Sequence, residues 1–422
     1  MVRVRIRGGL AVLVAAVVLI VSAACRATTS SAVPAGETAG VWAPEIPTGL
    51  PPVGTLRDAR SGFVHPGVLV SGTQLDFVIG KVQAGEEPWL SAWLALRRSR
   101  YADLGWHPEP IAVVECGYYS QPDRGCTREA EDAVAAYTHA LLWVFTRDTR
   151  YAEKAVQILD AWAQVLRRHA NSNAQLQAGW SGATFVRAAE LIKHTYPQWS
   201  PARSARAERM FRNVFLPQVT SSLKGYKAGN WGLIMLDAVV GISVFLDDRA
   251  SFFQALDVWR LRMRAYVYVA ADGPTPHVPP DGAFTKQRLV EYWGGQTRLV
   301  DGMAQETCRD LLHTGWGLAA AAHVAETAWI QGVDLYAEAR KRLIPALEFH
   351  ADFEMGAPVP PWLCGGQLQT GLDPLPEIAY NHYRVRMGFD LPVTRELVES
   401  RRPAGPAFFY AWETLTHAAN PR

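Results

Sequence analysis

The sequence lacks the concentrated positive charge that binding to nucleic acid requires. Its 422 residues hold 42 Lys and Arg against 40 Asp and Glu, so the formal net charge is only +2. The basic runs are short, such as Arg167-Arg168 and Arg401-Arg402. Because phosphate backbones are bound by concentrated basic surfaces, nucleic acid is excluded as the main partner.

Charged residues are also scarce, at 19%, whereas apolar residues make up 49% of the chain. This balance is typical of a globular protein and excludes an intrinsically disordered one. The length allows one to three domains. The sequence contains no repeat of fixed period, which disfavours helical arrays such as tetratricopeptide repeats.

Cysteine is scarce too, with five residues, and no spacing among them suggests a zinc site. We expect no metal ion and no cofactor. Without Cys25, which belongs to the N-terminal segment described next, four cysteines remain and three pairings are possible. Cys116 and Cys126 flank a loop rich in Gly, Pro and Asp, so we predict that they form a disulfide. Cys308 and Cys364 would then pair by elimination.

The N-terminal residues 1–25 have the composition of a targeting segment. Three arginines precede an apolar stretch at residues 10–21, and Ser22-Ala23-Ala24-Cys25 follows. This resembles a bacterial lipoprotein signal, in which Cys25 is lipidated and becomes the new N-terminus. A plain secretory signal is the first alternative. An uncleaved membrane anchor is the second, although the apolar run is short for a spanning helix. Each of these three segments would export the protein from the cytoplasm, either as a lipoprotein anchored in the periplasm or at the cell surface or as a secreted protein. Export permits disulfides.

The rest of the chain divides into a tether and a helical body. Residues 26–56, rich in Thr, Ser, Ala, Pro and Gly, are predicted to be a flexible tether. Residues 57–422 show helical periodicity without a comparable run of alternating strands. Paired helices with short turns predict an all-α fold, an incomplete α/α toroid. We expect helices at residues 73–84, 87–98, 130–146, 151–169, 180–196, 204–220, 231–245, 249–269, 309–331 and 335–349.

The tract 305–316 carries ionisable side chains at helical spacing. In a helix each residue turns about 100°, so Glu306, Arg309, His313 and Trp316 would fall within roughly 80° of one another. Burying those charges unpaired would be costly, so the face suits the wall of a cleft that holds an acidic sugar. The alternative is a structural Glu–Arg pair beside a histidine whose hydrogen bonds are satisfied.

Other motifs could line the same cleft. Asn230, in Gly229-Asn230-Trp231-Gly232, could cap a helix or hydrogen-bond a substrate carboxylate at the helix N-terminus. The chain has 15 Trp, and Trp231 is a candidate to stack on a sugar ring, although tryptophans also fill contacts between helices. Tyr118 and Tyr119, beside the predicted disulfide loop, could line the cleft or pack their own loop.

A further tract, residues 377–384, is dense in groups that donate or accept protons. It contains Tyr380, His382 and Tyr383. We consider the two tyrosines as catalytic candidates and His382 as a substrate-binding candidate. The alternative is a polar segment packed on the rim of the toroid.

Together these residues resemble the alginate-lyase-type polysaccharide lyases with an α/α toroid, a group that includes glucuronan lyases. The resemblance spans about residues 62–418. It rests on the order and spread of short motifs, which are His65-Pro66-Gly67, Gly229-Asn230-Trp231, Val244-Phe245-Leu246-Asp247-Asp248, Gln305-Glu306-Thr307-Cys308-Arg309-Asp310, His313-Thr314, Gln331-Gly332-Val333-Asp334-Leu335-Tyr336 and Ala411-Trp412-Glu413-Thr414-Leu415-Thr416-His417.

The resemblance implies β-elimination on a uronic-acid polymer. That reaction needs neutralisation of the C6 carboxylate, a base for the C5 proton and an acid for the leaving oxygen. By position, Asn230 and Glu306 would hold the carboxylate, with Glu306 protonated or hydrogen-bonded to it. Arg309 would add charge stabilisation, and His313 would be the base or orient it.

Trp316 departs from the pattern of the family, because many relatives carry Tyr at this position and an indole cannot transfer the required proton. If that tyrosine is the catalytic one, this protein is impaired or inactive. If Tyr380 or Tyr383 supplies the hydroxyl instead, Trp316 is a stacking platform, and this is the interpretation we favour.

We therefore predict a polysaccharide lyase that cleaves a polymer of the alginate or glucuronan type. Two other functions are compatible with the sequence. A catalytically impaired polysaccharide-binding lipoprotein would explain Trp316. A glycoside hydrolase on a helical toroid would need two carboxylates across a cleft, and Glu306 with Asp310 or Asp301 is the available pair.

Overall fold

The computed structural model describes residues 46–223, 229–279 and 285–422. The predicted signal segment, Cys25 and most of the predicted tether lie outside these residues. Within the described part of the chain, no helix combines the length and the apolar character needed to cross a membrane. The described residues belong to one compact helical body.

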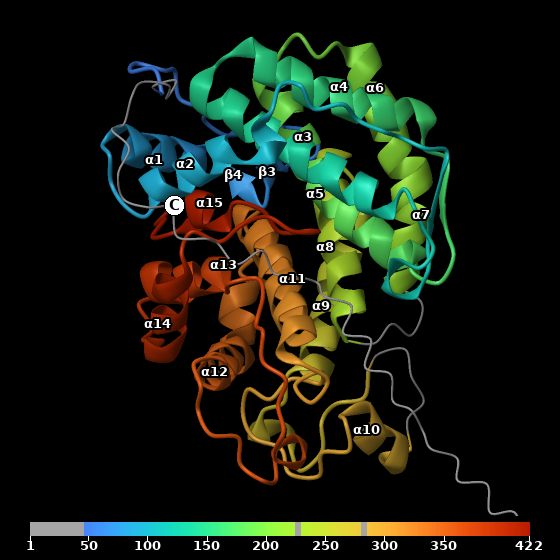
Figure 1. Ribbon diagram of the computed structural model, residues 1–422, viewed down its shortest axis with the longest axis vertical. Helices are drawn as coiled ribbons and strands as arrows, with labels where there is room; N and C mark the ends of the chain where they lie inside the picture. The colour runs from blue at the N-terminus through green and yellow to red at the C-terminus, as the bar shows by residue number, and fades with distance from the viewer. Residues whose placement is uncertain (1–45, 224–228, 280–284) are drawn as a thin grey trace, which may run out of the picture. The chain divides into compact units, whose positions relative to one another are not determined.

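The body is built mainly from α-helices that follow one another as antiparallel pairs (Figure 1). The helices are α1 (Gly72–Gln83), α2 (Trp89–Arg98), α3 (Cys126–Thr146), α4 (Thr149–Val165), α5 (Ala174–Thr195), α6 (Pro201–Met210), α7 (Leu216–Val219), α8 (Gly229–Phe245), α9 (Arg249–Tyr266), α10 (Lys286–Tyr292), α11 (Leu311–Ile330), α12 (Leu335–Glu354), α13 (Glu377–Tyr380), α14 (Pro392–Arg401) and α15 (Glu413–His417).

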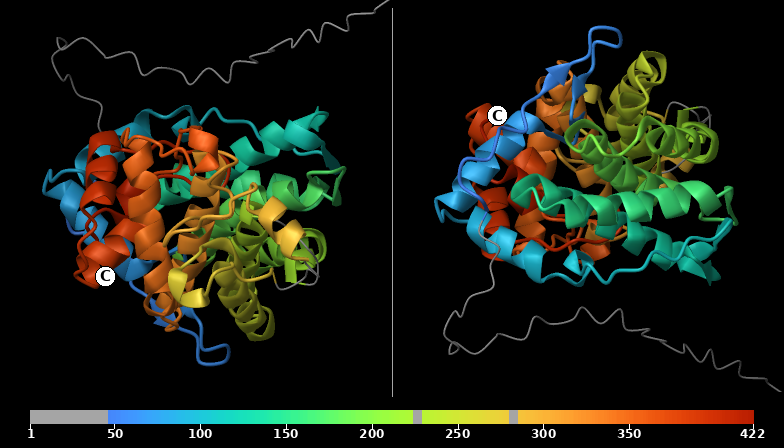
Figure 2. Two further views of the ribbon diagram at one scale, coloured as in Figure 1. Left: turned by 90° about the horizontal axis from the view of Figure 1, so that it is seen from below. Right: turned by 90° about the horizontal axis from the view of Figure 1, so that it is seen from above.

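Helices α3, α5, α8 and α11 form the inner layer, in which each packs against the next. Outside this layer, α4, α9 and α12 pack against α3, α8 and α11, respectively, and α6 packs against α4. The inner succession continues through α13 and α15 to α1 and α2, which gives an α/α toroid. The colours of Figure 2 follow the same order from teal α3 to orange α11.

The inner helices run parallel, so their first turns meet at one end of the ring, which we call the amino end. Nε2 of Gln177, in the first turn of α5, donates to the carbonyl of Cys126 at the start of α3, at 2.9 Å. The ring of Trp180 on α5 contacts that of Trp316 on α11, with centroids 5.6 Å apart. The last turns meet at the opposite end, the carboxyl end.

Buried charges join the inner helices halfway along their length, between the amino end and the carboxyl end. Arg187 of α5 donates to Asp237 of α8 at 2.7 Å, and His323 of α11 lies 2.9 Å from Asp237 and 2.7 Å from Glu413 of α15. Burial opposes the charged form of Asp237, but Arg187 and His323 outweigh it and hold the pKa of Asp237 below its usual value. Every charge in this group has a partner, which such deep burial requires.

The strands are short. They are β1 (Leu56–Arg57), paired with β2 (Val64–His65); β3 (Gly67–Val68), paired with β4 (Val70–Ser71); and a sheet of β5 (Val113–Cys116), β6 (Asp123–Arg124) and β7 (Arg168–Ala170) in the order β6-β5-β7. Strand β5 runs antiparallel to β6 and parallel to β7. Together, β3 and β4 contact the inner helices α5, α8 and α11.

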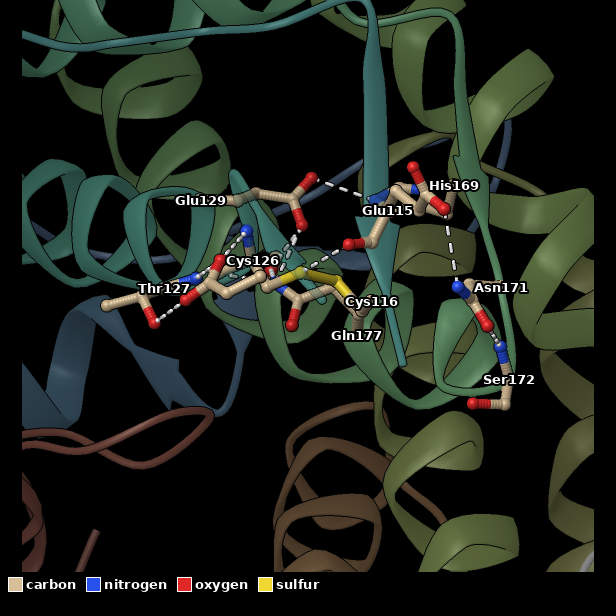
Figure 3. Close-up of a disulfide and its surroundings, with 11 residues drawn as sticks. Glu115, Cys116, Cys126, Thr127, Glu129, His169, Asn171, Ser172 and Gln177 are labelled. Atoms are coloured by element: carbon tan, nitrogen blue, oxygen red, sulfur yellow. Dashed lines mark hydrogen bonds and ion pairs between the residues drawn. A yellow bond between two sulfur atoms is a disulfide. The ribbon is translucent and has the colours of Figure 1, made fainter. Parts of the chain in front are cut away.

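Both predicted disulfides are confirmed, Cys116–Cys126 and Cys308–Cys364. The first joins β5 to the start of α3 at the amino end, as Figure 3 shows. Beside it, Glu129 accepts hydrogen bonds from His169 at 2.8 Å and from Gln177 at 2.9 Å (Figure 3). These side chains are fully or almost fully buried, so this part of the amino end is a structural network.

The prediction of a helical toroid is confirmed, and most helix boundaries lie within a few residues of those expected. Two expected helices are wrong in part. The helix predicted at 151–169 ends at Val165, because residues Arg168–Ala170 pair with β5 as a strand. The helix predicted at 204–220 is interrupted by a π-helical turn at Phe211–Phe215, just before Pro217.

Candidate active site

A buried carboxylate–amide pair lies where α8 begins. The backbone N–H of Asn230 donates to Oε2 of Glu306 at 2.7 Å, and its side-chain Nδ2 lies 3.0 and 3.1 Å from the two carboxylate oxygens. Glu306 is only 4% exposed. Burial raises the pKa of Glu306 above its usual value, although Arg309 and Asn230 favour the charged form. Asn230 therefore holds Glu306 and does not cap the helix.

Gly229 permits this approach between α8 and Glu306. A Cβ atom at this position would lie 2.3 Å from Cδ of Glu306, and the φ angle of +55° is in the left-handed region that favours glycine. Gly232, one turn later, packs similarly against the guanidinium of Arg262, which a Cβ atom would approach to 2.9 Å. The two glycines of the Gly-Asn-Trp-Gly motif are thus explained by close packing.

We expect Gly229→Ala to lower the free energy of unfolding by about 2–4 kcal/mol, because the methyl group would separate Asn230 from Glu306 and the backbone would be strained. Chemical denaturation of the two proteins measures the difference. Gly80→Ala is the matched control, since Gly80 lies in α1 and a Cβ atom there would meet nothing within 4 Å. Equal stability of Gly229→Ala and wild type would contradict the proposed packing.

Arg309 connects the buried pair to a partly buried histidine, His313. Its Nη1 donates to Oε1 of Glu306 at 3.0 Å, and its Nη2 lies 2.8 Å from Nε2 of His313. Because arginine only donates, Nε2 of His313 accepts and carries a lone pair. The proton is then on Nδ1, which lies 2.7 Å from the Asp310 carboxylate. The Arg309 side chain is 42% exposed, against 16% for His313.

Asp310 fixes both the start of α11 and the histidine ring. It is the N-cap residue, and its Oδ1 accepts from the backbone N–H of His313 at 2.7 Å. Burial alone would raise the pKa of Asp310, but the hydrogen bonds from His313 outweigh it, and the pKa lies below its usual value. The result is a chain of polar groups, Asp310–His313–Arg309–Glu306–Asn230, which we call the polar chain.

Residues 305–316 do not form one helix, and the helix expected at 309–331 begins two residues later than predicted. Helix α11 begins at Leu311, after Asp310 in extended backbone, and Glu306 and Arg309 belong to the preceding turn. The side chains nevertheless meet, because the turn folds back on the helix start. The signal for this boundary was an Asp directly before the apolar run that opens α11.

The turn that carries Glu306 and Arg309 is held from several sides. The Cys308–Cys364 disulfide joins it to the loop before α13. Oγ1 of Thr307 lies 2.8 Å from Nε2 of the buried His350, on α12. Nε2 of Gln305 donates to the carbonyl of Tyr292 at 2.5 Å. These contacts fix the turn against α10, α12 and the loop, which suits a site that must hold its groups in place.

Two tyrosines lie beside the Asn230–Glu306 pair. The hydroxyl of Tyr266, at the end of α9, donates to Glu306 at 3.2 Å, and burial, followed by the charge of Glu306, raises the pKa of this tyrosine well above its usual value. The hydroxyl of Tyr292 accepts from the backbone N–H of Gly229 at 3.4 Å. Tyr292 is half-buried, and with Gly229 and Tyr266 it lines a small pocket. The sequence pattern alone assigned no role to either tyrosine.

Trp316 lies one turn after His313 but is 8% exposed. Its ring packs against Trp180 and Phe408, with centroids 5.6 and 5.2 Å apart, and against His313 at 5.2 Å. Phe408 is the exposed member of this group, at 40%. Trp316 thus stacks on rings of the protein itself, and Phe408 is the ring of this group that is exposed to solvent. Trp231, beside Asn230, is half-buried.

The structure does not bring residues 377–384 to the polar chain. The hydroxyl of Tyr383 donates to the carbonyl of Tyr336 at 3.0 Å, and His382 stacks on the Tyr336 ring with centroids 3.7 Å apart. These groups surround Glu326, near the carboxyl end of α11. His313 and Glu326 are 13 residues apart on one helix, which separates them by roughly 20 Å. Tyr380 is buried at 5% exposure in the same segment.

Tyr118 and Tyr119 are 70% and 86% exposed, in a turn next to the Cys116–Cys126 disulfide. That disulfide places the turn at the amino end of the ring, where the polar chain also lies. Their place in the cleft stays a prediction.

Known proteins support the family resemblance. A family model for alginate lyase matches residues 115–279. The crystal structure of alginate lyase A1-III from Sphingomonas species A1 is 19% identical, with a TM-score of 0.54 over 83% of this chain and 93% of that chain. Two variants of alginate lyase A1-III complexed with a tetrasaccharide, one His to Ala and one Tyr to Phe, are 20% and 21% identical. Each has a TM-score of 0.53 over 77% of this chain and 88% of the other. No curated protein sequence matches. The predicted resemblance to alginate-lyase-type proteins and the α/α toroid are thus confirmed.

Proposed function

We propose that this chain is a polysaccharide lyase that cleaves a polymer of uronic acids by β-elimination. The observation that supports it most is the polar chain, which combines a partly exposed cation, a histidine with a lone pair and a carboxylate that orients the histidine. These are the groups that remove a proton next to a carboxylate.

Arg309 is the group we assign to the C6 carboxylate of the substrate. Its side chain is 42% exposed, whereas Glu306 and Asn230 are buried beneath it. Guanidinium and carboxylate form paired hydrogen bonds, and neutralising the carboxylate makes the C5 proton more acidic. Glu306 and Asn230 then act as positioning residues that set the place of the guanidinium.

His313 is the proposed base. In the free protein its Nε2 accepts from Arg309 at 2.8 Å, so the lone pair is occupied. When Arg309 turns to the substrate carboxylate, Nε2 is released and can take the C5 proton. Asp310 keeps the other proton on Nδ1 and would stabilise the imidazolium that forms.

The bonds then change in the usual way for an elimination. The electron pair of the C5–H bond forms a C4–C5 double bond, the C4–O bond breaks, and the leaving oxygen takes a proton. We assign that proton to the hydroxyl of Tyr292, which lies next to Gly229 and is half-buried. The solved tetrasaccharide complexes of alginate lyase A1-III are of His and Tyr variants, which agrees with a histidine and a tyrosine in this chemistry.

A second candidate is a polysaccharide-binding protein without activity. It is favoured by Trp316, since the first two turns of α11 carry no tyrosine beside His313. A glycoside hydrolase is disfavoured. Asp310 is bonded to His313, and Asp301 accepts from the backbone N–H of Ala270 at 2.5 Å, so neither faces Glu306 as a free carboxylate.

A panel of polyuronates distinguishes these functions. We expect the protein to release products with the ultraviolet absorbance of a conjugated C4–C5 double bond from at least one of polymannuronate, polyguluronate or glucuronan. A hydrolase would give reducing ends without that absorbance. A binding protein would give neither but would gain thermal stability with the polymer. Absence of the absorbance on every polymer would refute the lyase proposal.

A further inference from the structure

A second group of ionisable side chains lies at the carboxyl end of the ring, away from the polar chain. It consists of His65 from β2, Glu190 and His194 from the last two turns of α5, and Asp247 from the turn after α8. Nδ1 of His65 lies 2.7 Å from Oε1 of Glu190, and its Nε2 lies 3.3 Å from Asp247. The rings of His65 and His194 stack in parallel, with centroids 4.2 Å apart.

The donor atoms of three of these residues converge. One ligand atom each from His65, Glu190 and His194 lies within 4.8 Å of the others. Ligands around a tetrahedral zinc ion stand about 3.3–3.5 Å apart, so a small inward shift would bring all three to bonding distance. Two imidazoles and one carboxylate are a donor set that zinc binds and that magnesium and calcium do not prefer.

Glu190 supplies an independent observation. It is 1% exposed, and its Oε1 already accepts from the backbone N–H of Gly67 at 3.0 Å. Its Oε2 is buried and has no hydrogen-bond partner within residues 46–223, 229–279 and 285–422, although it lies 3.6 Å from Nε2 of His194. A buried carboxylate oxygen without a donor is costly unless a cation or another donor completes it.

We propose that His65, Glu190 and His194 form a zinc site, with Asp247 as the outer carboxylate that orients His65. His65 would bind through Nδ1 while its Nε2–H donates to Asp247, which is a common arrangement behind zinc-bound histidines. Binding releases the Nδ1 proton that now lies between His65 and Glu190. The ion has three protein ligands, and a water fills the fourth position.

We assign a structural role to this site, although it has three protein ligands instead of four, because its ligands come from separate segments. It joins β2, the end of α5 and, through Asp247, the α8–α9 turn, which are segments distant in the sequence. It is separate from the proposed active site, since Trp180 and Glu190 of α5 are ten residues apart, which is roughly 15 Å along the helix. Zinc would therefore stabilise the fold whether or not the protein is a lyase.

The test is zinc binding to the full chain after treatment with a chelator. We expect calorimetry to detect one high-affinity Zn²⁺ per chain and Zn²⁺ to raise the melting temperature by about 2–5 °C, with no such rise for Mg²⁺. His194→Phe should weaken Zn²⁺ binding at least about 100-fold, because it removes one ligand but keeps a ring to stack on His65. The partly exposed position of His194, at 24%, makes unfolding of this variant unexpected.

His107→Ala is the control for non-specific binding to an exposed imidazole and should leave Zn²⁺ affinity unchanged. Asp247→Asn should weaken the affinity by about 10–100-fold, since it alters only the outer partner of His65. The proposal is overturned if wild type binds no Zn²⁺, or if His194→Phe binds it as tightly as wild type. If wild type binds no Zn²⁺, the four side chains are a hydrogen-bonded network that holds β2 on α5.

Discussion

His313→Ala is expected to lower kcat on the cleaved polyuronate by about 10²–10⁴-fold and to leave binding of the polymer largely intact. The reason is the position of the ring. His313 carries the lone pair on Nε2, and Asp310 holds its other nitrogen at 2.7 Å. The contact with the substrate carboxylate is assigned to Arg309, which remains in the variant. Steady-state kinetics by ultraviolet absorbance and calorimetry with an oligosaccharide measure the two effects.

Two control variants make the result specific. His107→Ala removes an exposed histidine outside the polar chain and should leave kcat unchanged. Asp310→Asn should retain the helix cap, because Asn also caps helices well, yet lower kcat by loss of the negative charge behind His313. If His313→Ala turns over normally, the histidine is not the base. If its activity and its melting temperature fall together, His313 has a structural role.

The helices of this protein could be predicted from its sequence because their apolar faces repeat with the helical period. For α3 and α5 the pattern was clear, although both begin earlier than predicted, at Cys126 and Ala174. What the period could not show is a local interruption that tertiary contacts impose. The strand Arg168–Ala170 forms only because β5 is there to pair with it.

The residues of the candidate site were predicted to lie together, but the predicted arrangement that brings them together was partly wrong. Asn230, Glu306, Arg309 and His313 do meet, but a turn and an N-cap bring them together instead of one helix face. A spacing of three or four residues is compatible with both arrangements. The extended backbone conformation of Asp310, directly before α11, decides between the two arrangements.

Tyr383 shows the limit of arguing from composition. The tract around it is rich in proton-transfer groups, but these serve a buried network around Glu326. In a ring of helices, residues far apart in sequence can lie at either end, and the packing of α13 against α11 and α15 determines which end they occupy. Tyr266 likewise contacts Glu306, and Tyr292 contacts Gly229, although the members of each pair are far apart in the sequence.

Tyr292→Phe is expected to lower kcat by about 10²–10³-fold with little change in polymer binding, because the change removes only the hydroxyl that we assign to the leaving oxygen. Tyr383→Phe is the matched control. It also removes one tyrosine hydroxyl, but a buried one bonded to the Tyr336 carbonyl, so it should cost about 1 kcal/mol of stability and leave kcat unchanged.

Trp316→Tyr completes the comparison, because it places a hydroxyl on α11 one turn after His313. If Tyr292 is the acid, this variant should gain no activity, and it should lose some stability because the smaller ring fills less of the space between Trp180 and Phe408. If wild type is silent and Trp316→Tyr cleaves polyuronates, the catalytic tyrosine belongs on α11 and the natural protein is a binder. An active wild type whose kcat falls with Tyr383→Phe and not with Tyr292→Phe would instead show that the acid acts from the opposite end of α11, and the site proposed around Glu306 would have to be abandoned.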